Sequence, residues 1–287
     1  MTCPNMLNEF SADQGIHTVA GFVGEDWPAF FLQFRPEFAP RAHVLYLPPF
    51  GEEMNRCRAL VATQARRFAR DGLTCTILDF YGTGDSSGEL CEATLPIWRQ
   101  NIQDMLERLL ARHACPVYLW GCRLGALLGL DFLAFQPDST MKLLLWQPVV
   151  SGKAYVTQLL RQRSAALMQT GKKPESTAEM KNRLAAGETL EVAGYRIGGE
   201  LIRAISGLDI AQVVQDRLPD NKPEIFWFEH LPDEESGPGA RARRAIEELR
   251  HGGAQVTVIP FNGEPLWQLH KRASCDDLLQ KTGELRW

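Results

Sequence analysis

The hydrophobic residues of this chain follow two alternating patterns. Short apolar runs, such as residues 73–80 and 143–146, show little polar alternation, which is typical of strands buried on both faces. Between them, longer segments such as 54–68 and 95–111 repeat apolar residues at helical spacing. This alternation of buried strands and amphipathic helices predicts an α/β fold, with a mostly parallel sheet and helices on both faces.

The rest of the chain extends this pattern in both directions. Residues 17–23 and 29–34 flank a turn-rich segment and predict a β-hairpin. Further strands are expected at 43–47, 225–228 and 256–259, and further helices at 240–250 and 266–279.

The alternation stops between about residues 150 and 220. This segment is helical in pattern and basic, because residues 151–210 hold nine Lys or Arg against six Asp or Glu. We expect one α/β domain over residues 1–287, with a helical cap inserted at about 150–220 over the carboxyl edge of the sheet.

A very tight strand-to-helix turn is expected around Arg123. An apolar run ends at Gly121, and Gly125 opens a second apolar run made of helix formers. The spacing Gly121-x-Arg123-x-Gly125 is that of the Gly-x-Ser-x-Gly nucleophile elbow. Arginine cannot attack a substrate, because its guanidinium stays protonated in proteins.

With the loop Asp79-x-x-Gly82-x-Gly84-x-Ser86-x-Gly88, this turn resembles the α/β-hydrolase superfamily. Three motifs, at residues 47–55, 119–126 and 263–267, more narrowly resemble the exosortase A system-associated hydrolase 2 group. Such proteins are encoded beside the PEP-CTERM sorting and exopolysaccharide machinery of Gram-negative bacteria. The resemblance covers roughly residues 15–270. It implies an α/β-hydrolase fold, nominal hydrolysis or transfer of an ester or thioester acyl group, and exosortase or exopolysaccharide system proteins as partners.

The resemblance also assigns catalytic positions, and the chain departs from the Ser-His-Asp pattern at two of them. The nucleophile position falls on Arg123 and the base position at Glu264, while Asp233 fits the acid position better than Glu229 does. An unpaired guanidinium at a helix N-terminus is opposed by the helix dipole and by desolvation. We therefore expect Arg123 and Glu264 to form an ion pair.

An oxyanion site is expected to survive, with the backbone N–H groups of Phe50 and Leu124 as its donors. Together with Arg123, these groups favour an acyl or anionic ligand, such as a carboxylate, a phosphate or a sugar acid. Trp267 is the further residue expected at this pocket.

Three interpretations of this degenerate triad stay open. Arg123 is a structural plug locked to Glu264 and Asp233, or the centre of a binding pocket without chemistry, or part of a rebuilt hydrolase site. In the second case the protein is a pseudoenzyme, an accessory protein that binds an anionic metabolite or an export-system partner.

Other candidate catalytic residues fit less well. Cys122 lies one residue early, where an elbow turns its side chain away from the cleft. Ser86 and Ser87 suit turn formation rather than catalysis. His230 and His270 lie outside the position that the family gives its base, and surface positions are expected for both.

Composition narrows the classes of ligand, cellular compartment and cofactor that the chain is expected to have. The chain has 287 residues, 45% of them apolar, and a net charge of −4, which favours neither nucleic acid nor an anionic membrane. Its longest apolar run, 124–135, is too short to span a bilayer, and the N-terminus has no signal-peptide pattern. The seven cysteines show no metal-site spacing, so we expect reduced thiols in the cytoplasm and no metal. No cofactor is expected either, since the glycines at 82, 84 and 88 do not form a dinucleotide fingerprint.

Overall fold

The computed structural model describes residues 8–13, 15–136, 140–217, 222–231, 236–263, 265 and 275–287. Nine strands of this part of the chain form one sheet, in the order β1-β2-β3-β5-β4-β6-β7-β10-β11. Their bounds are β1 Asn8–Asp13, β2 Ile16–Val23, β3 Ala29–Pro36, β4 His43–Leu47, β5 Thr74–Leu78, β6 Val117–Cys122, β7 Lys142–Trp146, β10 Glu224–His230 and β11 Gln255–Phe261. The pairs from β5 to β11 are parallel, and β1, β2 and β3 add an antiparallel edge.

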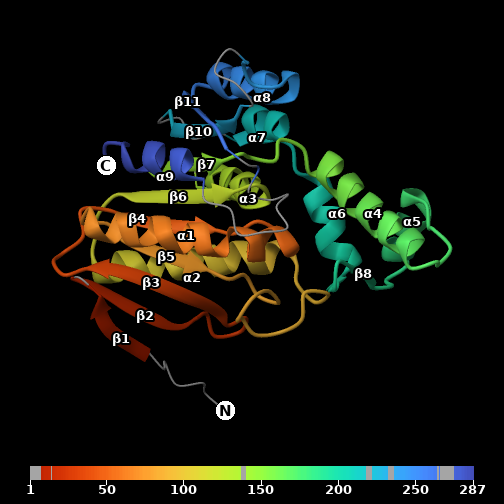
Figure 1. The fold of residues 1–287 in the computed structure, drawn as a ribbon, viewed down its shortest axis with the longest axis horizontal. Helices are drawn as coiled ribbons and strands as arrows, with labels where there is room; N and C mark the ends of the chain where they lie inside the picture. The colour runs from red at the N-terminus through yellow and green to blue at the C-terminus, as the bar shows by residue number, and fades with distance from the viewer. Residues whose placement is uncertain are drawn as a thin grey trace.

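Helices cover both faces of this sheet (Figure 1). The helices α1 (Glu52–Arg70) and α9 (Asp276–Gly283) pack on one face. The helices α2 (Leu95–Arg112), α3 (Leu124–Ala134) and α8 (Ala240–His251) pack on the other. The sequence prediction of a mostly parallel sheet inside two helical layers is confirmed. Among the described residues, no helix combines the length and hydrophobicity needed to cross a bilayer.

Six elements are described between β7 and β10. They are α4 (Gly152–Gln169), α5 (Thr177–Ala185), β8 (Leu190–Val192), β9 (Tyr195–Ile197), α6 (Gly199–Gly207) and α7 (Ile210–Arg217). From α4 to α6 they project beside the sheet, at the right of Figure 1, and this segment is called the cap below. The cap contains the antiparallel hairpin β8–β9, whereas the sequence pattern predicted helices alone.

Two further differences from the sequence prediction lie at the ends of the chain. Strand β1 pairs with β2 at the sheet edge and was not expected. The last helix was expected over 266–279, and the described α9 begins at Asp276 and continues to Gly283. Residues 266–274 lie outside the described part of the chain.

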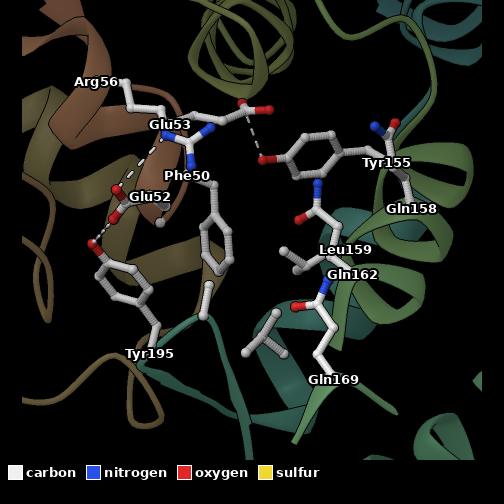
Figure 2. Close-up of a pocket in the computed structure, with 13 residues that line it drawn as sticks. Phe50, Glu52, Glu53, Arg56, Tyr155, Gln158, Leu159, Gln162, Gln169 and Tyr195 are labelled. Carbon is white, nitrogen blue, oxygen red and sulfur yellow. Dashed lines mark hydrogen bonds and ion pairs between the residues drawn. The ribbon is translucent and has the colours of Figure 1, made fainter. Parts of the chain in front are cut away.

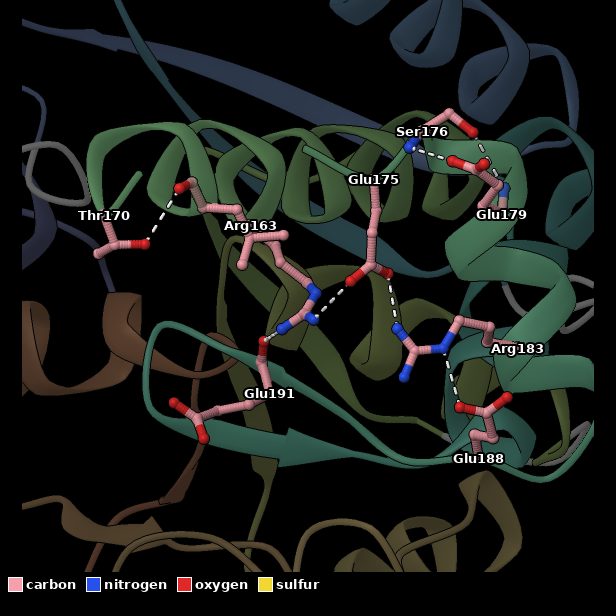
Figure 3. A network of polar contacts seen from close by, with 9 residues as sticks. Arg163, Thr170, Glu175, Ser176, Glu179, Arg183, Glu188 and Glu191 are labelled. Atoms are coloured by element: carbon pink, nitrogen blue, oxygen red, sulfur yellow. Dashed lines mark hydrogen bonds and ion pairs between the residues drawn. The ribbon is translucent and has the colours of Figure 1, made fainter. Parts of the chain in front are cut away.

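A network of charged side chains ties the cap together (Figure 3). Glu175 accepts hydrogen bonds from Arg163 Nη2 on α4, at 3.1 Å, and from Arg183 Nη1 on α5, at 2.7 Å. Arg163 also donates to the backbone carbonyl of Glu191 in the hairpin. The Glu175 carboxylate therefore joins α4 to α5, and Arg163 joins α4 to the hairpin.

We expect the substitution Glu175→Gln to loosen the cap at neutral pH. Burial tends to raise the pKa of Glu175, but hydrogen bonds from Arg183 and Arg163 outweigh it and hold the pKa below 4.5. This stabilisation is present above pH 4.5 and is lost as the pH falls through the lowered pKa. Hydrogen exchange of residues 176–192 should therefore be faster in Glu175→Gln than in wild type at pH 7. The difference should vanish in strong acid, and equal rates at pH 7 would contradict the network's role.

Candidate functional site

The turn between β6 and α3 has the geometry expected of an elbow. Arg123 joins the two elements with φ 53° and ψ −114°, a backbone region that non-glycine residues rarely adopt. A Cβ on Gly121 would lie 2.3 Å from Ala126 Cα, and one on Gly125 would lie 2.1 Å from the Leu47 carbonyl oxygen. The two glycines therefore let strand, helix and the loop after β4 approach closely.

The Arg123 side chain is 13% exposed and lies among polar groups. Its Nε is 3.6 Å from Glu53 Oε2, and its Nη1 donates to the Gln147 carbonyl at 3.4 Å. The Tyr155 hydroxyl, from cap helix α4, donates to the same Glu53 oxygen at 3.3 Å. The Arg123–Glu53 pair thus links α3 with α1, and Tyr155 links both to the cap.

Burial changes the acidity of this cluster. It raises the pKa of Glu53 above its ordinary 4.5, although Arg123 and Tyr155 act in the opposite direction. Burial also raises the pKa of Tyr155 well above 10, and the neighbouring Glu53 charge adds to this. Tyr155 therefore stays protonated at neutral pH and acts as a hydrogen-bond donor.

A second buried carboxylate, Glu229, lies at the end of β10 and is 6% exposed. It accepts hydrogen bonds from Trp227 Nε1 at 2.7 Å and from Gln147 Nε2 at 3.3 Å. Burial raises its pKa, and both hydrogen bonds and the charge of Arg123 oppose the increase. Gln147 has a positive φ of 43°, and its Oε1 accepts from the His230 backbone N–H at 2.5 Å. The ends of β7 and β10 are thereby fixed beside Arg123.

A cleft of about 480 Å³ opens between the N-terminus of α1 and the cap (Figure 2). Tyr155 and Glu53 lie together at one end of it, and Tyr195 and Glu52 lie on the side opposite α4. The Tyr195 hydroxyl donates to Glu52 Oε2 at 3.3 Å and accepts from Asn55 Nδ2 at 2.7 Å. The residues that line the cleft are Phe50, Gly51, Glu52, Glu53, Arg56, Tyr155, Gln158, Leu159, Gln162, Gln169, Val192, Ala193 and Tyr195.

The comparisons with known proteins agree with this geometry. A family model described as Hydrolase_4, serine aminopeptidase S33, matches residues 39–192. The chain belongs to this family. The match runs from the loop before β4 through the elbow to the hairpin of the cap. Among curated proteins, no sequence matches the chain.

Solved structures share the fold at low sequence identity. Est1E from Butyrivibrio proteoclasticus, bound to ferulic acid, has a TM-score of 0.57 and 15% identity over 92% of this chain and 94% of its own. A thermostable carboxyl esterase from Bacillus coagulans has a TM-score of 0.58 and 12% identity over 91% of each chain. A hypothetical protein from Pseudomonas aeruginosa has a TM-score of 0.61 and 11% identity, over 96% of this chain and 94% of its own. These likenesses show an α/β-hydrolase fold.

The structure describes three of the residues that the sequence places at the site. Arg123 lies in the tight turn between β6 and α3, which is the turn to which the sequence prediction assigns the nucleophile position. Leu124 is the first residue of α3, so its N–H has no carbonyl partner within that helix. Phe50, in the loop after β4, lines the cleft. The remaining three, Asp233, Glu264 and Trp267, lie outside the described residues, so the Arg123–Glu264 ion pair stays a prediction.

The other nucleophile candidates are buried or already engaged. Cys122 is 1% exposed, and a hydrogen bond with Cys57, together with burial, raises the pKa of its thiol well above 9. Ser86 Oγ donates to the Asp79 carbonyl at 2.6 Å and accepts from the Phe30 N–H at 2.7 Å, so it closes the glycine-rich loop. Both findings agree with the sequence interpretation.

His230 contacts the loop after β11, since its Nε2 is 2.5 Å from the carbonyl oxygen of Gly263. His270 lies outside the described residues. In the described part of the chain, no group of His, Cys, Asp or Glu side chains is arranged to hold a metal ion.

Sequence reasoning missed Glu53 and Gln147, both of which contact the Arg123 side chain. In the sequence, Glu53 is one of two acids in the first turn of α1, where acids suit the helix dipole, and this pattern does not connect it with Arg123. Gln147 carried no signal at all. The available signal for Glu53 was its place directly after the loop that holds Phe50, because this loop meets the elbow in α/β-hydrolases.

We expect Gly125→Ala to destabilise the protein by about 3 kcal/mol, because its Cβ would overlap the Leu47 carbonyl oxygen. Urea unfolding would measure this. Gly207→Ala is the matched control, since nothing lies within 4 Å of that Cβ, and alanine there should leave stability unchanged or raise it. Equal stability of Gly125→Ala and wild type would contradict the close approach.

We expect the stability of wild type relative to Glu53→Gln to fall as the pH rises. The pKa of Glu53 is raised in the folded state, so its contribution is full below pH 4.5 and is lost as the pH rises through the raised value. Urea unfolding of both proteins between pH 4.5 and 7.5 would measure the difference. A constant difference over this range would show that Glu53 titrates normally.

Proposed function

We propose that this protein keeps the hydrolase fold but does not use Ser-His-Asp catalysis, and that it acts as an accessory binding protein through the cleft between α1 and α4. One observation carries the proposal. The side chain that the elbow presents is the guanidinium of Arg123, which is neither a nucleophile nor a base.

The contacts of Arg123 support this proposal. Glu53 lies on one side of the guanidinium, and the carbonyl oxygen of Gln147 accepts a hydrogen bond from it. Tyr155 holds Glu53 from the cap and stays protonated, so it offers no base. The set is arranged to stabilise a buried charge, and it contains no nucleophile with an adjacent base.

The exosortase-associated grouping is the finer part of the proposal. Two of the three motifs that carry the resemblance meet at the site, because Glu53 belongs to the first and Arg123 to the second. We propose that the partners are proteins of an exosortase or exopolysaccharide export system, met in the cytoplasm. The six cysteines recorded within the described residues are all free thiols, which fits that compartment.

A rebuilt hydrolase is the second candidate function. It is favoured by Glu229, a buried carboxylate with a raised pKa near Arg123, because acids with such pKa values serve as proton donors or acceptors in many active sites. Arg123 would then hold a developing negative charge rather than attack.

Hydrolysis of p-nitrophenyl acetate and of acyl-CoA decides between the two candidates. We expect no activity above background in wild type, Arg123→Ala, Cys122→Ala or Arg123→Ser. Arg123→Ser should be inactive as well, because a serine also needs a neighbouring base, and the base position is assigned to Glu264. Circular dichroism would establish that each variant is folded.

Three outcomes would contradict the proposal. Activity of wild type that disappears in Arg123→Ala would favour the rebuilt hydrolase. Activity that disappears in Cys122→Ala would reveal a thiol enzyme. Activity gained in Arg123→Ser would refute the assignment of Glu264 to the base position.

A further inference from the structure

The charges around the cleft are already compensated. Arg56 Nε lies 3.7 Å from Glu52 Oε1, and Arg123 Nε lies 3.6 Å from Glu53 Oε2. Both carboxylates belong to residues that line the cleft, whereas Arg123 is not among the lining residues. An entering anion would therefore be repelled by the carboxylates of Glu52 and Glu53, because like charges repel. The guanidinium of Arg56, which also lines the cleft, already has Glu52 beside it.

The opposite wall offers hydrogen-bonding capacity without charge. Gln158, Gln162 and Gln169 all project from α4, and Gln162 and Gln169 extend toward Phe50 (Figure 2). None of the three amides bonds to another side chain or carbonyl within the described chain. Each amide can donate two hydrogen bonds and accept two. A ligand that both donates and accepts would suit this wall.

Aromatic rings supply the apolar part of the lining. Phe50 lines the cleft, although only 5% of the residue is exposed, and Tyr155 and Tyr195 add rings at opposite ends of the polar wall formed by Glu52 and Glu53. Rings of this kind pack well against C–H groups of a ligand, while the tyrosine hydroxyls stay available for hydrogen bonds.

From these features we propose that the cleft binds an uncharged, hydroxyl-rich molecule. Its hydroxyl groups donate to the carboxylates of Glu52 and Glu53 and exchange hydrogen bonds with Gln162 and Gln169. Its C–H face packs on Phe50. A cleft of about 480 Å³ lies within the usual size of small-molecule sites. This inference rests on the proposed function in one respect, namely that the cleft is a ligand site.

Two pyranoses that differ in charge test the ligand class directly. The probes are D-glucose and D-glucuronate, titrated into the full chain at pH 7 and low ionic strength, with binding followed by calorimetry and by tryptophan fluorescence. We expect glucose to bind at millimolar concentration and glucuronate to bind about tenfold more weakly or not at all, because of the two glutamates. Tighter binding of glucuronate would overturn the proposal in favour of an anionic ligand. No binding of glucose would overturn it as well.

Substitutions in the cleft test whether glucose binds there. The double substitution Gln162→Leu, Gln169→Leu should weaken glucose binding about tenfold, because two amide contacts are removed. Gln280→Leu, at an exposed position on α9, is the control and should leave it unchanged. Equal affinity of the double variant and wild type would remove the cleft from the proposal. Ester hydrolysis by wild type with glucose binding intact would instead contradict the proposed function alone.

Discussion

The ion pair between Arg123 and Glu53 organises the functional region. A guanidinium at the head of α3 is opposed by the positive end of the helix dipole, and at 13% exposure it has little water around it. A carboxylate from the start of α1 compensates both effects. Because Glu53 is itself buried, it needs further support, which comes from Arg123 and from the Tyr155 hydroxyl. One charge in the elbow therefore requires a partner from α1 and a donor from the cap.

The cleft follows from the same contacts. Tyr155 and Tyr195 reach from two parts of the cap to adjacent glutamates of α1, so the cap is anchored on both sides of the opening. The Glu175 network holds α4, α5 and the hairpin as one unit behind these anchors. These ionic and polar contacts add to the apolar packing of the cap, because Val156, Leu160 and Ile202 belong to the same buried cluster as the sheet. The carboxylates that neutralise Arg56 and Arg123 also give the cleft its polar, nearly neutral character.

Much of the fold could be predicted from local patterns. Residues 73–80 and 143–146 show little polar alternation because β5 and β7 are covered on both faces, and that pattern is typical of a parallel strand. The hairpin β8–β9 escaped prediction because each strand has three residues, too few for a periodic signal. The edge strand β1 escaped prediction for another reason, because its sequence, Asn-Glu-Phe-Ser-Ala-Asp, shows no regular hydrophobic alternation. The elbow was recognised because a steric requirement, two glycines around one residue, leaves a fixed spacing.

The sequence by itself determined the fold class and the tight turn at Arg123, since both leave patterns among near neighbours in the chain. It also showed directly that this turn holds an arginine in place of a serine. Only the tertiary structure decided what surrounds the guanidinium. Glu53, Gln147 and Tyr155 come from three other elements, and their sequence separations carry no information about a shared position. Electrostatic compensation depends on distance in space and on burial. Chain folding sets both, so the charge of the cleft could be stated only from the assembled sheet and cap.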